Sequence, residues 1–139
     1  MNIPQKLRRS VLERAQERCE YCGLSQSGQE ALFHVDHVIP LAAGGETEFA
    51  NLALACVSCS LQKGARQSVL DPATGAMTPI YNPRRDPWNL HFWWQGTHIV
   101  GLTPIGRATI EALRLNRSLI LAIREEEQAR GRHPPMRQL

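Results

Sequence analysis

The sequence has no long apolar run and almost no lysine. No stretch of about eighteen or more apolar residues occurs in the 139-residue chain, which argues against a membrane span. The N-terminal residues lack the continuous apolar core of a signal peptide, so we expect a cytoplasmic protein. The chain also lacks the low apolar content and the charge excess of a disordered protein. We therefore expect a globular domain that is large enough to bury a core.

The charge is mildly positive, at +3, and it comes from arginine. Of the sixteen basic residues only two, Lys6 and Lys63, are lysines. Arginine suits bidentate contacts with phosphate better than lysine does. A small positive charge also serves solubility, so the composition leaves a nucleic-acid partner open.

The four cysteines form two C-x2-C pairs, Cys19 with Cys22 and Cys56 with Cys59. Without an export signal, such pairs favour a metal site over disulfides. Each C-x2-C turn points two thiolates at one ion, and Gly23 permits the tight turn after the first pair. The alternatives are buried reduced cysteines or a redox motif, but a redox motif would occur once, at a helix N-terminus. Four thiolates leave no open position, so we expect a structural zinc.

Helix and strand patterns alternate before residue 70. Residues 4 to about 18 have the apolar spacing of an amphipathic helix, and residues 24–30 form a polar loop. Residues 31–41 are typical of a strand that ends near Pro40. The chain then turns and returns through a short strand or helical turn to the second cysteine pair. A short helix is expected from about Cys56 to Lys63.

The second half predicts a loop, a hairpin and a long helix. Residues 71–88 are rich in proline and indicate an ordered surface loop, and a two-stranded hairpin is expected around Gln95-Gly96. One helix is expected from Thr103, a plausible N-cap, to Gly131. Its arginines share the face opposite the apolar one, where they form either a solvated cationic face or a phosphate-binding stripe: Arg107, Arg114, Arg117 and Arg124.

An acidic and an imidazole side chain stand side by side in an apolar run, at Asp36 and His37. Removing such groups from water costs roughly several kcal/mol unless a bound partner compensates for the lost hydration. A carboxylate is a natural ligand for Mg2+, and a neutral imidazole is a natural base for activating water. Together they are the minimum for metal-assisted phosphodiester hydrolysis, although a lone Asp-His dipeptide is more often a chance neighbour.

The order of motifs resembles the HNH endonuclease family, in its variant with a four-cysteine zinc. The chain has a first cysteine pair, "VDHVIPLAAGG", "FANLALACVSC" and "LQKG" over residues 4 to about 67. Residues 80 to about 125 also resemble the C-terminal extension of a bacterial subgroup. The resemblance implies an α+β fold with a small ββα-metal core in residues 1–70. Residues 71–139 would be an extension packed on that core, giving a single domain overall.

The resemblance also implies roles for individual residues. His37 would be the general base that activates water, and Asp36 would bind the catalytic ion, Mg2+ or Mn2+. Asn51 would orient the base and hold the loop in place. Zn2+ would be held by the four cysteines, and duplex DNA would be the substrate.

The pattern departs from the family at its last position. The family has a His or Asn there as a ligand of the catalytic metal, and this chain has Ser60. A hydroxyl is a weaker ligand, which can still hold Mg2+ directly or through water, whereas ions that prefer imidazole would lose more. His34 lies two residues before Asp36, so both share one strand face. His34 is therefore a further metal ligand, a phosphate contact, or only a hydrogen-bonded strand residue.

Three functions fit these features. The first is a metal-dependent DNA endonuclease, with phosphate contacts expected from four basic residues: Lys63, Arg66, Arg84 and Arg85. The second is a zinc-stabilised nucleic-acid-binding module whose catalysis is weakened or lost at Ser60. The third is a small structural zinc protein that binds another protein.

Overall fold

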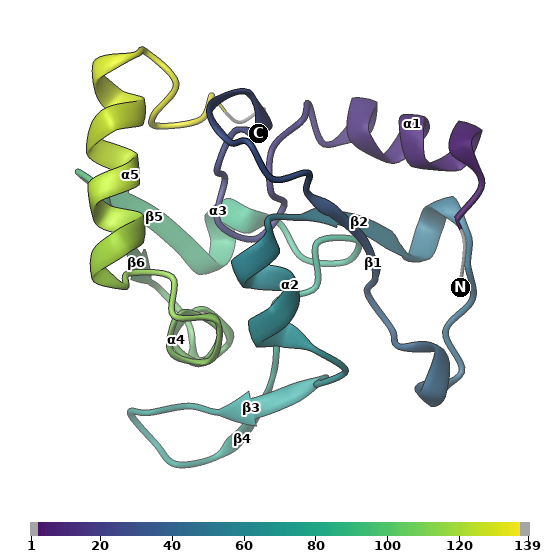
Figure 1. Ribbon diagram of the computed structural model, residues 1–139. Coiled ribbons are helices and arrows are strands. Elements are labelled where there is room, and N and C mark those ends of the chain that lie inside the picture. Colours follow the sequence, from purple (N-terminus) through teal and green to yellow (C-terminus); the bar gives the residue numbers. More distant parts are fainter. Residues whose placement is uncertain (1–2, 137–139) are drawn as a thin grey trace. The chain divides into compact units, whose positions relative to one another are not determined.

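The computed structural model describes residues 3–136 (Figure 1). These residues fall into two compact units. The first unit runs to Arg66 and includes Asn82–Arg85. The second consists of Gln67–Tyr81 and the chain from Asp86 onward. The predicted packing of residues 71–139 on residues 1–70 as a single domain stays a prediction.

The first unit has the helix–strand–strand–helix order that a ββα core requires. Its elements are α1 (Gln5–Arg14), a 3-10 turn (Gln26–Gly28), β1 (His34–His37), two further 3-10 turns (Leu41–Ala43 and Phe49–Asn51), β2 (Leu52–Ala55) and α2 (Val57–Lys63). Strands β1 and β2 are antiparallel, with His34 opposite Ala55 and His37 opposite Leu52. Helix α2 packs against both strands. The predicted α+β class and ββα core are confirmed.

Burial explains why β2 is a strand and why α2 follows it. All four residues of β2 are buried, so the strand has an apolar environment on both faces. Cys56 then caps α2, because its sulfur accepts from the backbone N–H of Cys59 at 3.4 Å. The helix ends at Gly64, whose φ of +53° stops helical propagation.

Helix α1 ends earlier than the predicted residue 18. Gln16 and Glu17 have left-handed φ values of 55° and 54°, and the backbone N–H of Glu17 donates to the Leu12 carbonyl at 2.9 Å. The chain reverses there, and Arg18 pairs with Ser25 in an isolated β-bridge. The apolar spacing of a helix continues beyond Arg14, so the sequence predicted a longer helix. The turn that carries the first cysteine pair requires the helix to end earlier.

The second unit contains two hairpins and three helices among its described residues. They are β3 (Ser68–Leu70), β4 (Met77–Pro79), α3 (Trp88–His91), β5 (Phe92–Gln95), β6 (His98–Gly101), α4 (Pro104–Leu113) and α5 (Ser118–Ala129). The predicted hairpin around Gln95-Gly96 is confirmed, since Gln95 lies opposite His98 and Gly96 has a φ of +61°. The prediction that residues 71–88 are only a loop was wrong, because β4 lies within them.

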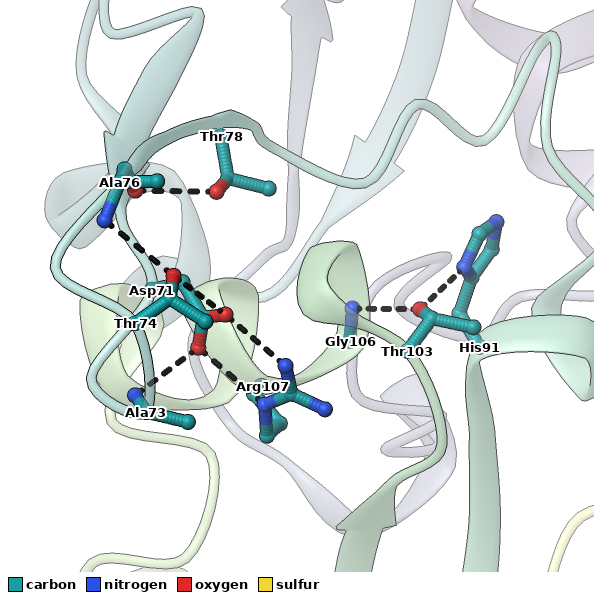
Figure 2. Close-up of polar contacts among 9 residues, drawn as sticks. All are labelled: Asp71, Ala73, Thr74, Ala76, Thr78, His91, Thr103, Gly106 and Arg107. Carbon is teal, nitrogen blue, oxygen red and sulfur yellow. Dashed lines mark hydrogen bonds and ion pairs between the residues drawn. The ribbon is translucent and has the colours of Figure 1, made fainter.

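A buried carboxylate organises the turn between β3 and β4 (Figure 2). Asp71 is fully buried and accepts from the backbone N–H of Ala73 at 3.1 Å and from the hydroxyl of Thr74 at 3.1 Å. The Arg107 guanidinium donates to both of its oxygens, at 3.2 and 2.9 Å. These contacts, first of all the one with Arg107, lower the pKa of Asp71 to about 2. The turn is thus fixed by a partner from α4, which no local pattern indicates.

The predicted long helix was wrong in one respect, because it is two helices. Helix α4 ends at Leu113, and Arg114 takes a left-handed conformation with φ of 52°. Asn116 then pairs with the backbone of Ile99 in β6, accepting from its N–H and donating to its carbonyl, both at 2.8 Å. Arg124, predicted on a solvated cationic face, is 2% exposed and donates to the Leu115 carbonyl at 2.7 Å. The start was predicted correctly, since Thr103 caps α4 through the N–H of Gly106 (Figure 2).

Candidate active site and zinc centre

The four cysteine sulfurs converge in the first unit. All four side chains are buried, and their sulfurs lie within 4.8 Å of one another. Each pair sits in a turn closed by an N–H···S contact, from Cys22 to Cys19 at 3.5 Å and from Cys59 to Cys56 at 3.4 Å. Gly23, with φ of +80°, makes the turn after the first pair. Two turns from distant parts of the chain therefore aim four thiols at one point.

The geometry and chemistry of this cluster fit zinc. A tetrahedral ion with Zn–S distances of about 2.3 Å separates its sulfurs by about 3.8 Å. The sulfurs of Cys22 and Cys56 are 3.8 Å apart. Hydrogen bonding, first of all with Cys19, lowers the pKa of Cys22 well below its ordinary value and raises those of Cys56 and Cys59. Four thiols this close ionise together only when a cation neutralises them, so the cluster is a zinc-type metal site.

Strand β1 presents the acidic and imidazole side chains on two faces. His34 and Asp36 alternate with buried Val35, so they project to the same side. Nδ1 of His34 lies 2.8 Å from Oγ of Ser60, which identifies that side as the one facing α2. His37, the last residue of the strand, projects to the other side. All three polar side chains of the strand are partly buried.

His37 is held by a residue that the sequence did not single out. Its Nε2 lies 2.8 Å from Oγ1 of Thr47, in the loop between the two strands. No other described residue forms a hydrogen bond with the His37 ring. A threonine three residues after Gly44 carries no motif, and only the folded loop brings it to the imidazole.

Asn51 closes the loop that carries Thr47. Its Oδ1 accepts from the N–H of Ile39 at 2.9 Å, and its Nδ2 donates to the carbonyls of Ile39 and Glu46 at 3.0 and 2.9 Å. Gly45 permits this closure, because a Cβ there would lie 1.9 Å from the Ile39 carbonyl oxygen. The amide of Asn51 thus ties the two ends of the loop together.

Lys63 lies under the end of β1. It is 2% exposed, and its ammonium donates to the carbonyls of Val38 at 3.2 Å and His37 at 3.4 Å. Burial lowers its pKa, and the charge of Asp36 opposes that shift. A phosphate contact by Lys63 stays a prediction, while in this structure the ammonium is occupied by the strand.

The three predicted arginine contacts differ in their surroundings. Arg84 is partly buried, where it forms an ion pair with Glu20 and donates to the Leu52 carbonyl at 3.2 Å. Burial raises the pKa of Glu20 although Arg84 opposes the shift. Arg66 and Arg85 are exposed. Only these last two present their side chains at the surface of the unit.

The family model of the HNH endonucleases matches residues 19–66. The match begins at the first cysteine of the zinc-type site and ends just beyond α2, so it spans β1, β2 and both cysteine pairs. Residues 19–66 are an HNH endonuclease domain. No curated protein and no solved structure matches the chain. HNH proteins are generally nucleases that use divalent metals and act on nucleic acids, so the match points to a nuclease or nucleic-acid-related function.

The resemblance puts the three family positions at His37, Asn51 and Ser60, and these roles stay predictions. The structure brings His34 and Ser60 into contact and puts Asp36 on the same face of β1 as His34. His91, His98 and His133, to which the sequence gives no role, belong to the second unit. Between residues 3 and 136, no helix combines the length and the apolarity that a membrane crossing requires.

Proposed function

We propose that this chain is a divalent-metal-dependent endonuclease that hydrolyses phosphodiester bonds of DNA. The observation that supports this most directly is the environment of His37, within an HNH domain. Its Nε2 lies 2.8 Å from the Thr47 hydroxyl, and when Nε2–H donates to that oxygen, Nδ1 keeps the lone pair that can accept a proton. Its neighbour in the strand, Asp36, offers a carboxylate on the face toward α2. The proposed base and the proposed metal-binding oxygen therefore come from consecutive residues at the end of one strand, one on each of its faces.

Each residue of the site has a distinct part in this reaction. His37 takes a proton from the attacking water, and Thr47 fixes the orientation of its ring. Asn51 keeps the loop closed and so keeps Thr47 in place. Asp36 would hold Mg2+ or Mn2+, for which a hard oxygen ligand is suited. When bound there, such an ion would supply positive charge to offset the negative charge on the leaving oxygen.

The phosphate backbone would be held by cations of the same unit. Arg66 follows α2, and Arg85 lies in the segment Asn82–Arg85, which belongs to the first unit, called the HNH unit from here on. Both are exposed, and a guanidinium matches two phosphate oxygens at once. These contacts would position DNA without reading its sequence.

Cleavage of supercoiled plasmid DNA by the zinc-loaded protein tests the proposal. We expect nicking or cutting with Mg2+ or Mn2+ and none when both are omitted. His37→Ala should lower the rate by about 100-fold or more, because a general base contributes roughly 10²–10⁴-fold. His98→Ala is the matched control, since His98 is exposed in the second unit. Cleavage at the wild-type rate by His37→Ala, with zinc content unchanged, would show that His37 is not the base.

A second function, a nucleic-acid-binding module without catalysis, is favoured by Ser60 alone. Ser60 stands where the family has a His or Asn ligand, and its hydroxyl is in contact with His34. The wild-type protein would then bind duplex DNA with an affinity that falls with salt, and it would not cut. Cleavage gained by Ser60→Asn would support this function, and cleavage by the wild type would exclude it.

A further inference from the structure

The contact between His34 and Ser60 joins a residue of β1 to the family position on α2. Nδ1 of His34 and Oγ of Ser60 are 2.8 Å apart, although 26 residues separate them in sequence. Both side chains are partly buried, and no other described residue forms a hydrogen bond with the His34 ring. One ring nitrogen is thus engaged by a neutral hydroxyl, and the other, Nε2, has no hydrogen-bonding partner within the described chain.

We propose that His34, with its ring oriented by Ser60, supplies the nitrogen ligand of the catalytic metal, which makes the site selective for Mn2+-like ions. This inference rests on the proposed function, because it assigns a ligand to the same ion that Asp36 binds. When Nδ1–H donates to the serine oxygen, Nε2 keeps its lone pair. Histidines that bind metals commonly donate their other N–H to a polar partner in this way. Ser60 is then a positioning residue and not a ligand.

The placement of Asp36 supports this assignment. His34 and Asp36 are two residues apart on β1, a rise of about 6.6 Å, and they share the face that looks toward α2. A carboxylate and an imidazole lone pair are both electron donors, so they repel a hydrogen-bond acceptor and attract a cation placed between them. A carboxylate and an imidazole therefore share one face of β1. The nitrogen ligand would come from His34 on this strand, and not from the family position on α2, which is Ser60 here.

The ligand set has a consequence for metal choice. A site with only Asp36 and a serine hydroxyl would favour Mg2+, which prefers oxygen. Imidazole raises the affinity for first-row transition ions above that for Mg2+. We expect the HNH unit to bind Mn2+ more tightly than Mg2+, and the zinc cluster to stay occupied by zinc because Mn2+ prefers harder ligands than thiolates.

Electron paramagnetic resonance of Mn2+ added to the zinc-loaded full chain tests the assignment without DNA. The wild type should bind one Mn2+ with an electron spin-echo signature of a coordinated ¹⁴N nucleus. His34→Ala and the milder His34→Gln should remove that signature and weaken Mn2+ binding by at least about tenfold. Ser60→Ala should weaken binding by roughly 10-fold or more, and Ser60→Thr, which keeps the hydroxyl, should restore it. His98→Ala should retain both affinity and signature, and zinc content reports that each variant is folded.

The outcomes separate this inference from the proposed function. A nitrogen signature that persists in folded His34→Ala or His34→Gln overturns the assignment. So does Mn2+ binding that depends on Ser60 and not on His34, which would make the hydroxyl the ligand. A wild type that binds Mn2+ through nitrogen yet never cleaves DNA supports the ligand assignment and refutes the endonuclease. A wild type that cleaves DNA with Mn2+ but shows no ¹⁴N signature supports the endonuclease and refutes the ligand assignment.

Discussion

Lys63→Met tests whether this lysine supports the active-site strand or contacts phosphate. Methionine keeps most of the length of the side chain but has no ammonium. Lys63 is 2% exposed in the wild type, and its ammonium donates to the carbonyls of His37 and Val38 at 3.4 and 3.2 Å. Its removal leaves the backbone beside the proposed base without these donors, so we expect both stability and cleavage to fall.

The size of the effect follows from two opposing terms. A hydrogen bond from a charged donor contributes about 1.5–3 kcal/mol, and these two are long enough to fall near the lower value, which gives roughly 3 kcal/mol. Replacing a buried ammonium by an apolar group recovers part of the cost of its desolvation. We therefore expect a loss of about 1–3 kcal/mol in the free energy of unfolding of the HNH unit.

Zinc release during guanidinium unfolding reports on this unit, because all four cysteines lie in it. Lys6→Met is the matched control, since Lys6 is the other lysine of the chain and is exposed on α1. DNA binding measured across salt concentrations gives the second readout. A phosphate contact would instead leave the unfolding free energy unchanged and lower the salt-dependence slope by about 0.9. That pair of results for Lys63→Met would refute the structural role.

Two further predictions concern stability. Removal of zinc by a strong chelator, or Cys59→Ser, should unfold the HNH unit, because binding of a structural zinc contributes on the order of 10 kcal/mol; retained far-UV dichroism in the metal-free chain would contradict this. The second unit should lose stability in acid as Asp71 is protonated. Its pKa of about 2 lies below the ordinary value of 3.8, so the carboxylate stabilises the fold above about pH 4 and this contribution disappears as the pH falls through 2. Tryptophan fluorescence measures that transition, since all three tryptophans lie in the second unit, and Asp71→Asn should flatten its pH dependence between 4 and 2.

Local patterns predicted those parts of the fold whose hydrogen bonds are local. The β5–β6 turn at Gly96 and the cap of α4 at Thr103 depend on residues within a few positions, and both are present. The break between α4 and α5 depends on Asn116, which bonds to the backbone of Ile99 seventeen residues earlier. A single apolar periodicity continues through that break, so the sequence pattern indicates one helix.

In the candidate site, too, features made by local contacts were predicted and those made by long-range contacts were not. The spacing of the cysteine pairs was enough to predict a metal site, because each pair is a local turn and four thiolates complete a tetrahedron. The partner of His37 could not be predicted, because Thr47 reaches the ring only after Asn51 has closed the loop. A lysine is expected at the surface from sequence alone. The burial of Lys63 depends on how α2 packs on β1.

The third HNH position, Ser60, shows that a metal ligand missing at one place in the sequence can be supplied by another residue of the same site. Strand β1 and helix α2 pack against each other, so a donor on either element is a candidate ligand for the ion that we propose at Asp36. Considered by itself, Ser60 predicts weaker binding of the catalytic metal, above all for ions that prefer imidazole. The contact with His34 reverses that expectation, since the imidazole is present on the strand and the serine holds it. Metal preference therefore distinguishes the two interpretations: a site with Ser60 as ligand should favour Mg2+, and one with His34 as ligand should favour Mn2+.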